Sequence, residues 1–160
     1  MNWFKRVIFP SALVMLTLAL MVTRAPGAVK LVKGQTIYIP SYSNIISDVQ
    51  RIVLKANLII HNTDPVHPIT LVSIDHYDTN GALVEKYLPQ PVKLHALGAI
   101  RIVIKEPKRG DEGAGANFVV KWQADHKVTE PLIECFMVGS LGAQGYSFSS
   151  QGRVIQEEGD

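Results

Sequence analysis

Apolar and polar side chains alternate along the segment from residue 51 to residue 61. Apolar residues fill every second position from Ile52 to Ile60, and the other set of positions includes Lys55 and Asn57. A period of two sends alternate side chains to opposite faces of an extended chain, so we expect a half-buried strand. The strand should end at Asn62–Pro65, because Asn and Asp side chains bond nearby backbone N–H groups and proline cannot continue a ladder.

The same period recurs through the rest of the chain. β-branched residues between Pro68 and Tyr77 predict a second strand. Asn80 and Gly81 tolerate positive φ, which favours a hairpin into a strand at 83–88. The run at 132–138 is nearly all apolar, which is typical of a central strand covered on both faces. Further strands are expected at 100–105, at 118–123 and around 146–154.

Helical periodicity is nearly absent after residue 28. The segment Ile45–Leu54 comes nearest to it, and we expect only a short turn there. Seven or eight short strands separated by turns predict an all-β fold, an immunoglobulin-like antiparallel β-sandwich. Trp122 alternates with Phe118 and Val120, so we place it in the core between the sheets. Cys135 is the only cysteine, which excludes an internal disulfide, and we expect it to be a small buried side chain.

The first 27 residues have the layout of an export signal. Two cations precede an uncharged apolar run at 7–22, and small residues follow at 25–28. The run is shorter than the roughly 20 apolar residues that a helix needs to cross a bilayer, so we expect residues 1–27 to be a cleaved signal peptide. A retained anchor at 7–22, tethering the chain to the inner membrane, is the alternative. In either case we expect residues 28–160 to form one periplasmic or secreted β domain.

The excess of cations in the full chain comes from this leading segment. The chain has 16 Lys and Arg against 14 Asp and Glu, a net charge of +2. Lys5, Arg6 and Arg24 lie within residues 1–27, so the remainder carries 13 cations against 14 acids and a net charge of about −1. Without a cationic field nothing argues for a nucleic-acid partner. A membrane becomes a partner only if the leading segment is retained.

Sequence motifs for catalysis are absent. Gly110, Gly113 and Gly115 match neither the dinucleotide-binding fingerprint nor the P-loop, and a strand follows where both motifs need a helix. No serine is flanked as in a nucleophile elbow, and there is no HExxH pair. The paired carboxylates Asp111-Glu112 and Glu157-Glu158 fall in segments predicted as solvated, whereas acid–base catalysis needs a water-poor pocket. We expect a protein without enzyme activity or cofactor, and an enzyme of unknown class is the least favoured hypothesis.

Histidines offer the one candidate for a metal site. His61 and His67 flank the turn that holds Asp64, so the three side chains could converge at one end of the sandwich. Imidazole nitrogens and a carboxylate suit copper or zinc. His76 lies well along the next strand and is not expected to join them. A periplasmic copper- or zinc-binding protein is therefore the second hypothesis, against the simpler interpretation of a polar turn in solvent.

Two glycine-rich segments are predicted as loops and provide a candidate contact surface. They span Glu106–Ala116 and Gly139–Gly145. Binding residues concentrate on loops that a rigid scaffold holds in place. The main hypothesis is an exported, non-catalytic binding module whose partner is another protein of the envelope. The candidate binding residues around the two loops are Gly113, Gly115, Asn117 and Gln144.

Four parts of the chain resemble a known family. They are the segments 62–65, 67–78, 115–122 and 145–153. The resemblance extends over nearly all of residues 28–160 and is most specific at Gly115–Phe118. The family that the chain resembles is bacterial, exported and of unknown function (domain of unknown function 3124), and this resemblance implies no activity, cofactor or catalytic residue.

Overall fold

The computed structural model describes residues 29–46, 50–104 and 115–158. All regular structure in these ranges is β-strand. No helix able to span a membrane lies within them, and the predicted signal segment 1–27 falls outside them. The strands are β1 (Leu31–Pro40), β2 (Asn44–Ile46), β3 (Arg51–His61), β4 (Ile69–Tyr77), β5 (Leu83–Lys86), β6 (Val92–Leu94), β7 (Ala99–Val103), β8 (Asn117–Thr129), β9 (Leu132–Leu141), β10 (Gln144–Gln151) and β11 (Arg153–Glu157).

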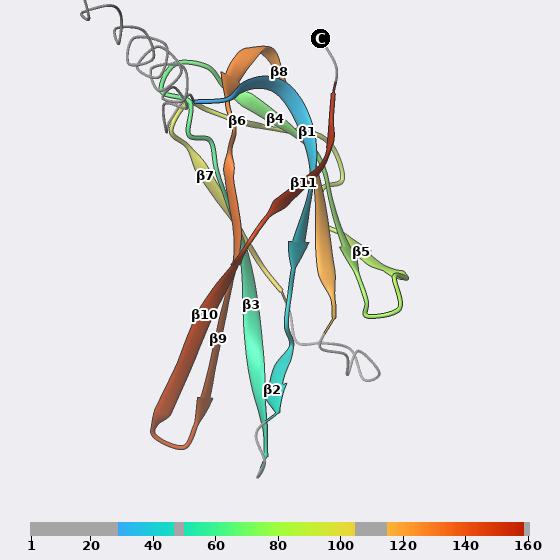
Figure 1. Ribbon diagram of the computed structural model, residues 1–160, viewed down its shortest axis with the longest axis vertical. Helices are drawn as coiled ribbons and strands as arrows, with labels where there is room; N and C mark the ends of the chain where they lie inside the picture. Colours follow the sequence, from blue (N-terminus) through green and yellow to red (C-terminus); the bar gives the residue numbers. More distant parts are fainter. Residues whose placement is uncertain (1–28, 47–49, 105–114, 159–160) are drawn as a thin grey trace, which may run out of the picture.

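The strands form two antiparallel sheets. The six-stranded sheet has the order β11-β1-β8-β4-β5, with β6 also paired to β4, and the five-stranded sheet has the order β10-β9-β3-β2, with β7 also paired to β3. Figure 1 shows the two sheets facing each other, with the β9–β10 hairpin extending to one side. The predicted all-β sandwich is confirmed. The structure has eleven strands in the described ranges, more than the seven or eight expected, because several edge strands are only three to five residues long.

The core lies between the inner faces of the two sheets. Trp122 and Phe118 of β8 are fully buried there, as predicted for Trp122. Cys135 is also fully buried, and burial raises the pKa of its thiol to about 11, which makes the thiolate scarce at neutral pH. The predicted inert, apolar role of this cysteine is consistent with both observations.

The segment in which a short turn was predicted before β3 also contains a strand pair. Ile45 of β2 lies opposite Ile52 of β3, and Leu54 donates its N–H to the carbonyl of Ser43. Only residues 47–49 of the segment lie outside the described ranges. The sequence did not predict β2, because a three-residue strand is too short to show a period of two. The expected turn before β3 stays a prediction, since it falls on residues 47–49.

One glycine allows the chain to change sheets near its C-terminus. β10 ends at Gln151 in the five-stranded sheet and β11 begins at Arg153 in the six-stranded sheet. Between them the N–H of Gly152 donates to the carbonyl of Ile133 (2.9 Å). A Cβ at this position would lie 2.6 Å from Cγ2 of Ile37, so only glycine lets the strand pass so close to the core. The two sheets are thereby joined through one continuous C-terminal segment.

Candidate functional site

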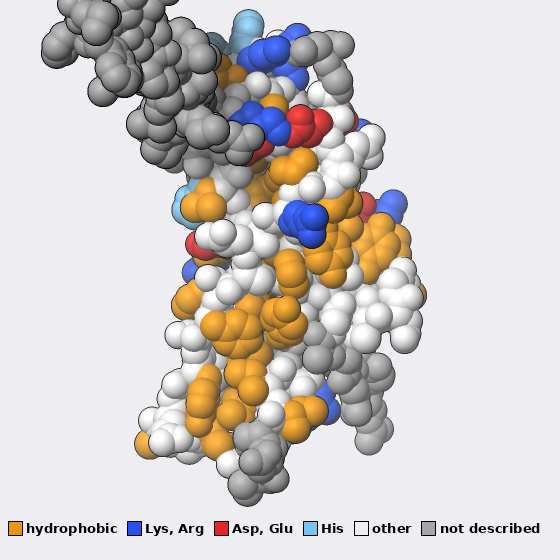
Figure 2. All heavy atoms as spheres, viewed as in Figure 1, with side chains coloured by type: hydrophobic (Ala, Val, Ile, Leu, Met, Phe, Trp, Pro, Cys, Tyr) orange, Lys and Arg blue, Asp and Glu red, His pale blue; other side chains and the backbone are white. Residues whose placement is uncertain are grey.

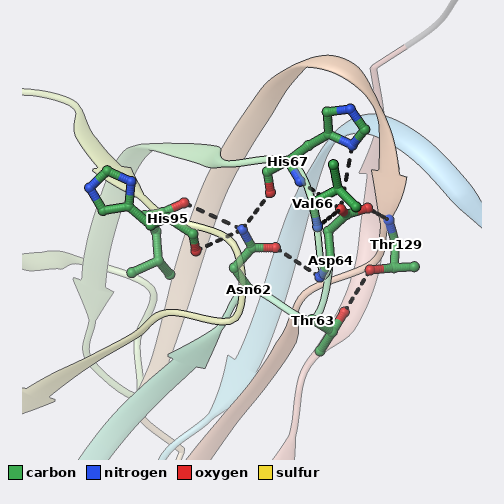
Figure 3. Close-up of polar contacts among 8 residues, drawn as sticks. Asn62, Thr63, Asp64, Val66, His67, His95 and Thr129 are labelled. Carbon is green, nitrogen blue, oxygen red and sulfur yellow. Dashed lines mark hydrogen bonds and ion pairs between the residues drawn. The ribbon is translucent and has the colours of Figure 1, made fainter.

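The turn between β3 and β4, residues 62–68, holds most of the predicted metal-site residues. Asn62 is its centre and is almost completely buried. Its Nδ2 is directed at the carbonyl oxygens of His67 (2.9 Å), His95 (3.0 Å) and Leu94 (3.3 Å), and its Oδ1 accepts the N–H of Asp64 (3.0 Å). Figure 3 shows how this one amide joins the turn to the chain that follows β6. Because each buried polar group here has partners, Asn62 has a structural role.

Asp64 has its carboxylate oxygens occupied by backbone donors. Oδ1 accepts the N–H groups of His67 (2.8 Å) and Val66 (2.9 Å), and Oδ2 accepts that of Thr129 (3.1 Å) at the end of β8. The hydrogen bond from His67, followed by that from Val66, lowers the pKa of Asp64 from its ordinary 3.8 to about 2, while burial opposes the shift. The carboxylate is thus ionised at neutral pH and is committed to fixing the turn.

The structure does not gather the predicted metal set into a ligand group. Nδ1 of His67 lies 3.4 Å from Oδ1 of Asp64, but the ring of His67 packs against that of His126, with centroids 5.0 Å apart. His61 lies on β3, opposite Ala99 and Leu132 in the ladder. Within 29–46, 50–104 and 115–158, no three His, Cys, Asp or Glu side chains are grouped so that they could hold a metal ion.

The structure gives two further histidines, His126 and His76, surroundings that the sequence did not predict. His126 belongs to β8, which runs on to Thr129, six residues beyond the predicted strand end at 123. His76 points into the sandwich, is nearly buried, and stacks on Phe118 with ring centroids 4.7 Å apart. It therefore packs as an aromatic core residue, separate from the turn at 62–68, as expected.

Beside this turn lies an open hollow of about 380 Å³, lined by Val29, Lys30, Thr63, Thr129 and Glu130. Lys30 forms ion pairs there with Glu130 (3.5 Å) and with Glu157, and the buried Gln35 donates its Nε2 to Glu130 (2.5 Å). Thr63 donates its hydroxyl to the carbonyl of Glu130 (2.6 Å). These contacts tie β1, β8, β11 and the β3–β4 turn together, so the charges of the hollow are largely paired among themselves.

The predicted contact loops are only partly loops. Gly113 lies outside the described residues, as does most of Glu106–Ala116. Gly115 donates its N–H to Oγ1 of Thr79 (3.3 Å), and Asn117 starts β8 opposite Tyr77 and Pro40. In Figure 1 the start of β8 and the tip of the β9–β10 hairpin lie well apart, so the two candidate regions do not form one surface.

The segment Gly139–Gly145, predicted as a loop, is the tip of a regular hairpin. β9 continues to Leu141 and β10 starts at Gln144, where Oε1 accepts the hydroxyl of Tyr146 (3.0 Å). The turn itself is Gly142-Ala143, and Gly142 has a φ of 56°. The loop prediction was wrong because glycines do not prevent ladder pairing; here only Gly142 needs its conformational freedom for the turn.

The outer face of the five-stranded sheet carries several exposed apolar side chains. Asn57 of β3 lies between Val103 of β7 and Phe136 of β9, which are 53% and 39% exposed. Leu132 and Val53 on the same face are 43% and 55% exposed. This corrects the expectation that the strand at 132–138 is covered on both faces. We call the four residues Val53, Val103, Leu132 and Phe136 the outer-face patch.

A second open hollow, of about 730 Å³, lies where β10 passes into β11. Figure 2 views the molecule from this side and shows hydrophobic side chains in a band along the face, with charged side chains gathered toward the upper end. Val154 and Ile155 contribute apolar surface to it, being 37% and 57% exposed. The hollow is lined by Tyr38, Pro40, Gln151, Arg153, Val154 and Ile155.

Comparison with known proteins supports the family resemblance. No curated protein matches the chain. The crystal structure of a protein described as Thermotoga maritima 1070 is similar at 10% sequence identity and a TM-score of 0.45, covering 78% of this chain and 97% of that protein. The sequence profile of the family described as "Protein of unknown function (DUF3124)" matches residues 34–155. Because that match spans more than half of the chain, the protein belongs to the DUF3124 family of unknown function.

Proposed function

We propose that this protein is an exported, non-catalytic binding module that contacts another protein of the cell envelope through the outer face of its five-stranded sheet. The observation that carries the proposal is the outer-face patch. Phe136 and Val103 flank the same residue of β3, and Leu132 lies on β9 four residues before Phe136. Several exposed apolar side chains on one face of a sheet are typical of protein contact sites, whereas isolated ones are common on any surface.

Charged residues of both signs are interspersed among these apolar positions. In the ladder, Ile59 lies between Arg101 and Glu134, and Lys55 lies opposite Val138. Apolar and aromatic side chains mixed with charges of both signs are typical of protein interfaces. A mixed surface of this sort favours a protein partner over a uniformly anionic surface such as a lipid headgroup layer.

The export part of the proposal rests on the leading segment at 1–27. Its cationic start and apolar run have the pattern of a secretory signal, and the remaining chain is a β domain that needs no disulfide. Fractionation of cells that express the full chain would test it. We expect the protein in the envelope or medium, with a mass that reveals whether residues 1–27 have been removed. Recovery from the cytoplasm at full length would overturn this part.

Site-specific photocrosslinking tests the binding surface. A photoreactive amino acid at Lys55, within the face, should trap an envelope protein in living cells, and the same group at Gln123, on the six-stranded sheet, should not. Phe136→Lys should abolish the product, because a charge at the centre of an apolar contact is costly. Ile155→Lys, at an exposed apolar site on the other sheet, should leave it unchanged. A product that survives Phe136→Lys would exclude the outer-face patch as the binding surface.

We do not propose either of the two alternative functions. The set His61, Asp64 and His67 is not proposed as a metal site, because Asp64 already accepts three backbone N–H groups. A catalytic function is not proposed either, since the hollows beside Lys30 and Arg153 are open, whereas acid–base chemistry needs an enclosed, water-poor site.

A further inference from the structure

We propose that β10 is a self-association edge: two copies of the chain pair their β10 strands antiparallel about Ser147 and join their five-stranded sheets into one continuous sheet. This inference does not depend on the outer-face patch or on any partner protein. It concerns the free side of β10, the last strand in the order β10-β9-β3-β2. Figure 1 shows β10 on the outer side of the hairpin, with β9 between it and β3.

β10 lacks the features by which sheet edges usually avoid pairing. Its eight residues pair with β9 without any register shift, so there is no bulge. Its sequence, QGYSFSSQ, contains no charge and no proline. Natural edge strands are generally short, charged, bulged or interrupted by proline, because an unprotected edge pairs with other strands.

Other sheet edges in the described ranges do carry such protection. The pairing of β11 with β1 shifts register between Thr36 and Ile37 of β1, which leaves Ile155 without a partner in this ladder. β11 also bears the charged residues Arg153 and Glu157. β5 is four residues long and includes Glu85 and Lys86. The remaining edge strands there, β2, β6 and β7, have three, three and five residues. Among the described edges, β10 alone is both long and unprotected.

The pattern of side chains along β10 favours a second copy as the occupant. If two copies pair about a two-fold axis at Ser147, Tyr146 of each lies directly opposite Phe148 of the other, and Gly145 lies opposite Ser149. Directly opposed residues of antiparallel strands share a face, and aromatic pairs stabilise such ladders. Because the strand is uncharged, self-pairing brings no like charges together. The segment is therefore complementary to itself, as a two-fold interface requires.

Contacts elsewhere in the fold restrict where this pairing can occur. Near the C-terminal end of β10, the hydroxyl of Ser150 donates to the carbonyl of Pro40 (2.5 Å), so β1 lies against that end. Phe148 is held on the inner face by Tyr42, with ring centroids 5.9 Å apart. The open stretch is therefore Gln144–Ser149, and Ser147 lies at the middle of the five residues, 145–149, that the proposed register uses.

Cysteine crosslinking tests both the pairing and its register. Ser147 is exposed and would face Ser147 of the second copy, within the Cα separation that a disulfide spans. After expression of the full chain and oxidation with diamide, Ser147→Cys should give a disulfide-linked dimer. Ser149→Cys should not, since its opposite residue is Gly145. Native Cys135 is buried and should stay reduced in both variants. Equal crosslinking of the two variants, or none in either, would contradict the proposal.

Sedimentation of the purified protein tests the association without any introduced thiol. The native chain should dimerise reversibly, because pairing through one strand buries less surface than a standard stable interface. Ser147→Lys places two cations opposite each other and should weaken the dimer about tenfold or more. Ala99→Lys adds the same charge on the far edge of the same sheet and should leave dimerisation unchanged. A native chain that remains monomeric at several hundred micromolar, or an edge that crosslinks instead to a different envelope protein, would overturn the assignment.

Discussion

The two faces of the five-stranded sheet differ although both carry apolar residues. Met137 of β9 faces inward and is completely buried, whereas its neighbour Phe136 faces outward and is 39% exposed. Met137 lies opposite Ala56 in the ladder and packs within the core, while Phe136 lies opposite Asn57. Alternation along one strand therefore separates a side chain that stabilises the fold from one that is available for contact.

This difference shows why apolar content alone does not identify a buried strand. The inner residues of β9 pack against the opposite sheet, so replacing them should lower the free energy of unfolding. The outer residues have no opposite layer in the described ranges, so replacing them should affect binding more than folding. Substitutions on the two faces test this division between residues for stability and residues for contact.

Met137→Ala should be strongly destabilising. Removing a fully buried methionine leaves a cavity between the sheets, and such truncations cost about 2–5 kcal/mol of unfolding free energy. Urea denaturation followed by tryptophan fluorescence, which reports on the buried Trp122, would measure the loss. A cost below about 1 kcal/mol would mean that the inner face is not packed as the structure shows.

Gly139→Ala should be the next largest effect. A Cβ at this position would lie 2.5 Å from the carbonyl oxygen of Val53, so β3 and β9 would have to move apart. We expect a loss of about 1–3 kcal/mol, as for other overpacked sites. Gly145→Ala, on the neighbouring strand with nothing within 4 Å of the new Cβ, is the matched control and should change stability by about 0.5 kcal/mol or less. Equal losses in the two variants would contradict the close approach at Gly139.

The parts of this fold that the sequence predicted are those with long, uninterrupted alternation. Ile52–Ile60 forms β3, and the Asn80-Gly81 turn joins β4 to β5 with Gly81 at a φ of 80°. The burial of Trp122 and Cys135 followed from their places in apolar strands. In each case a local pattern contained the information, because side-chain direction in a strand repeats every two residues.

The parts that the sequence missed depend on contacts between distant segments. The register of β1 with β8 shifts between Val32 and Gly34. β1 then buries Gln35, because Glu130, far along the chain, accepts its amide. Likewise, the packing of His67 against His126 joins residues from different strands, and no spacing rule foresees it. The sequence has apolar residues at both alternating sets of positions in 132–138. Nothing in the local pattern distinguishes a face covered by another layer from an exposed one.

The buried carboxylate of Asp64, in the β3–β4 turn, should also stabilise the fold. Its folded pKa of about 2 lies below the ordinary 3.8, so its contribution to stability is present above about pH 4 and is lost as the pH falls through 2. Asp64→Asn should lower the melting temperature at pH 7, and the gap to the native chain should narrow between pH 4 and pH 2. Asp125→Asn, at an exposed position on β8, is the control. A gap that stays constant with pH would show that the carboxylate charge does not stabilise the turn.

Phe136→Ser should have the smallest effect on folding and is the sharpest test of the division between faces. The side chain is partly exposed and has no opposite layer in the described ranges, so its loss should cost about 1 kcal/mol or less in urea denaturation. Its neighbour Met137 serves as the reference, since the two positions share strand, backbone environment and method. A cost near that of Met137→Ala would mean that the outer face is covered within the protein, and the outer-face patch could not then serve a partner. A small cost combined with loss of the Lys55 photocrosslink would show that Phe136 is kept apolar for contact.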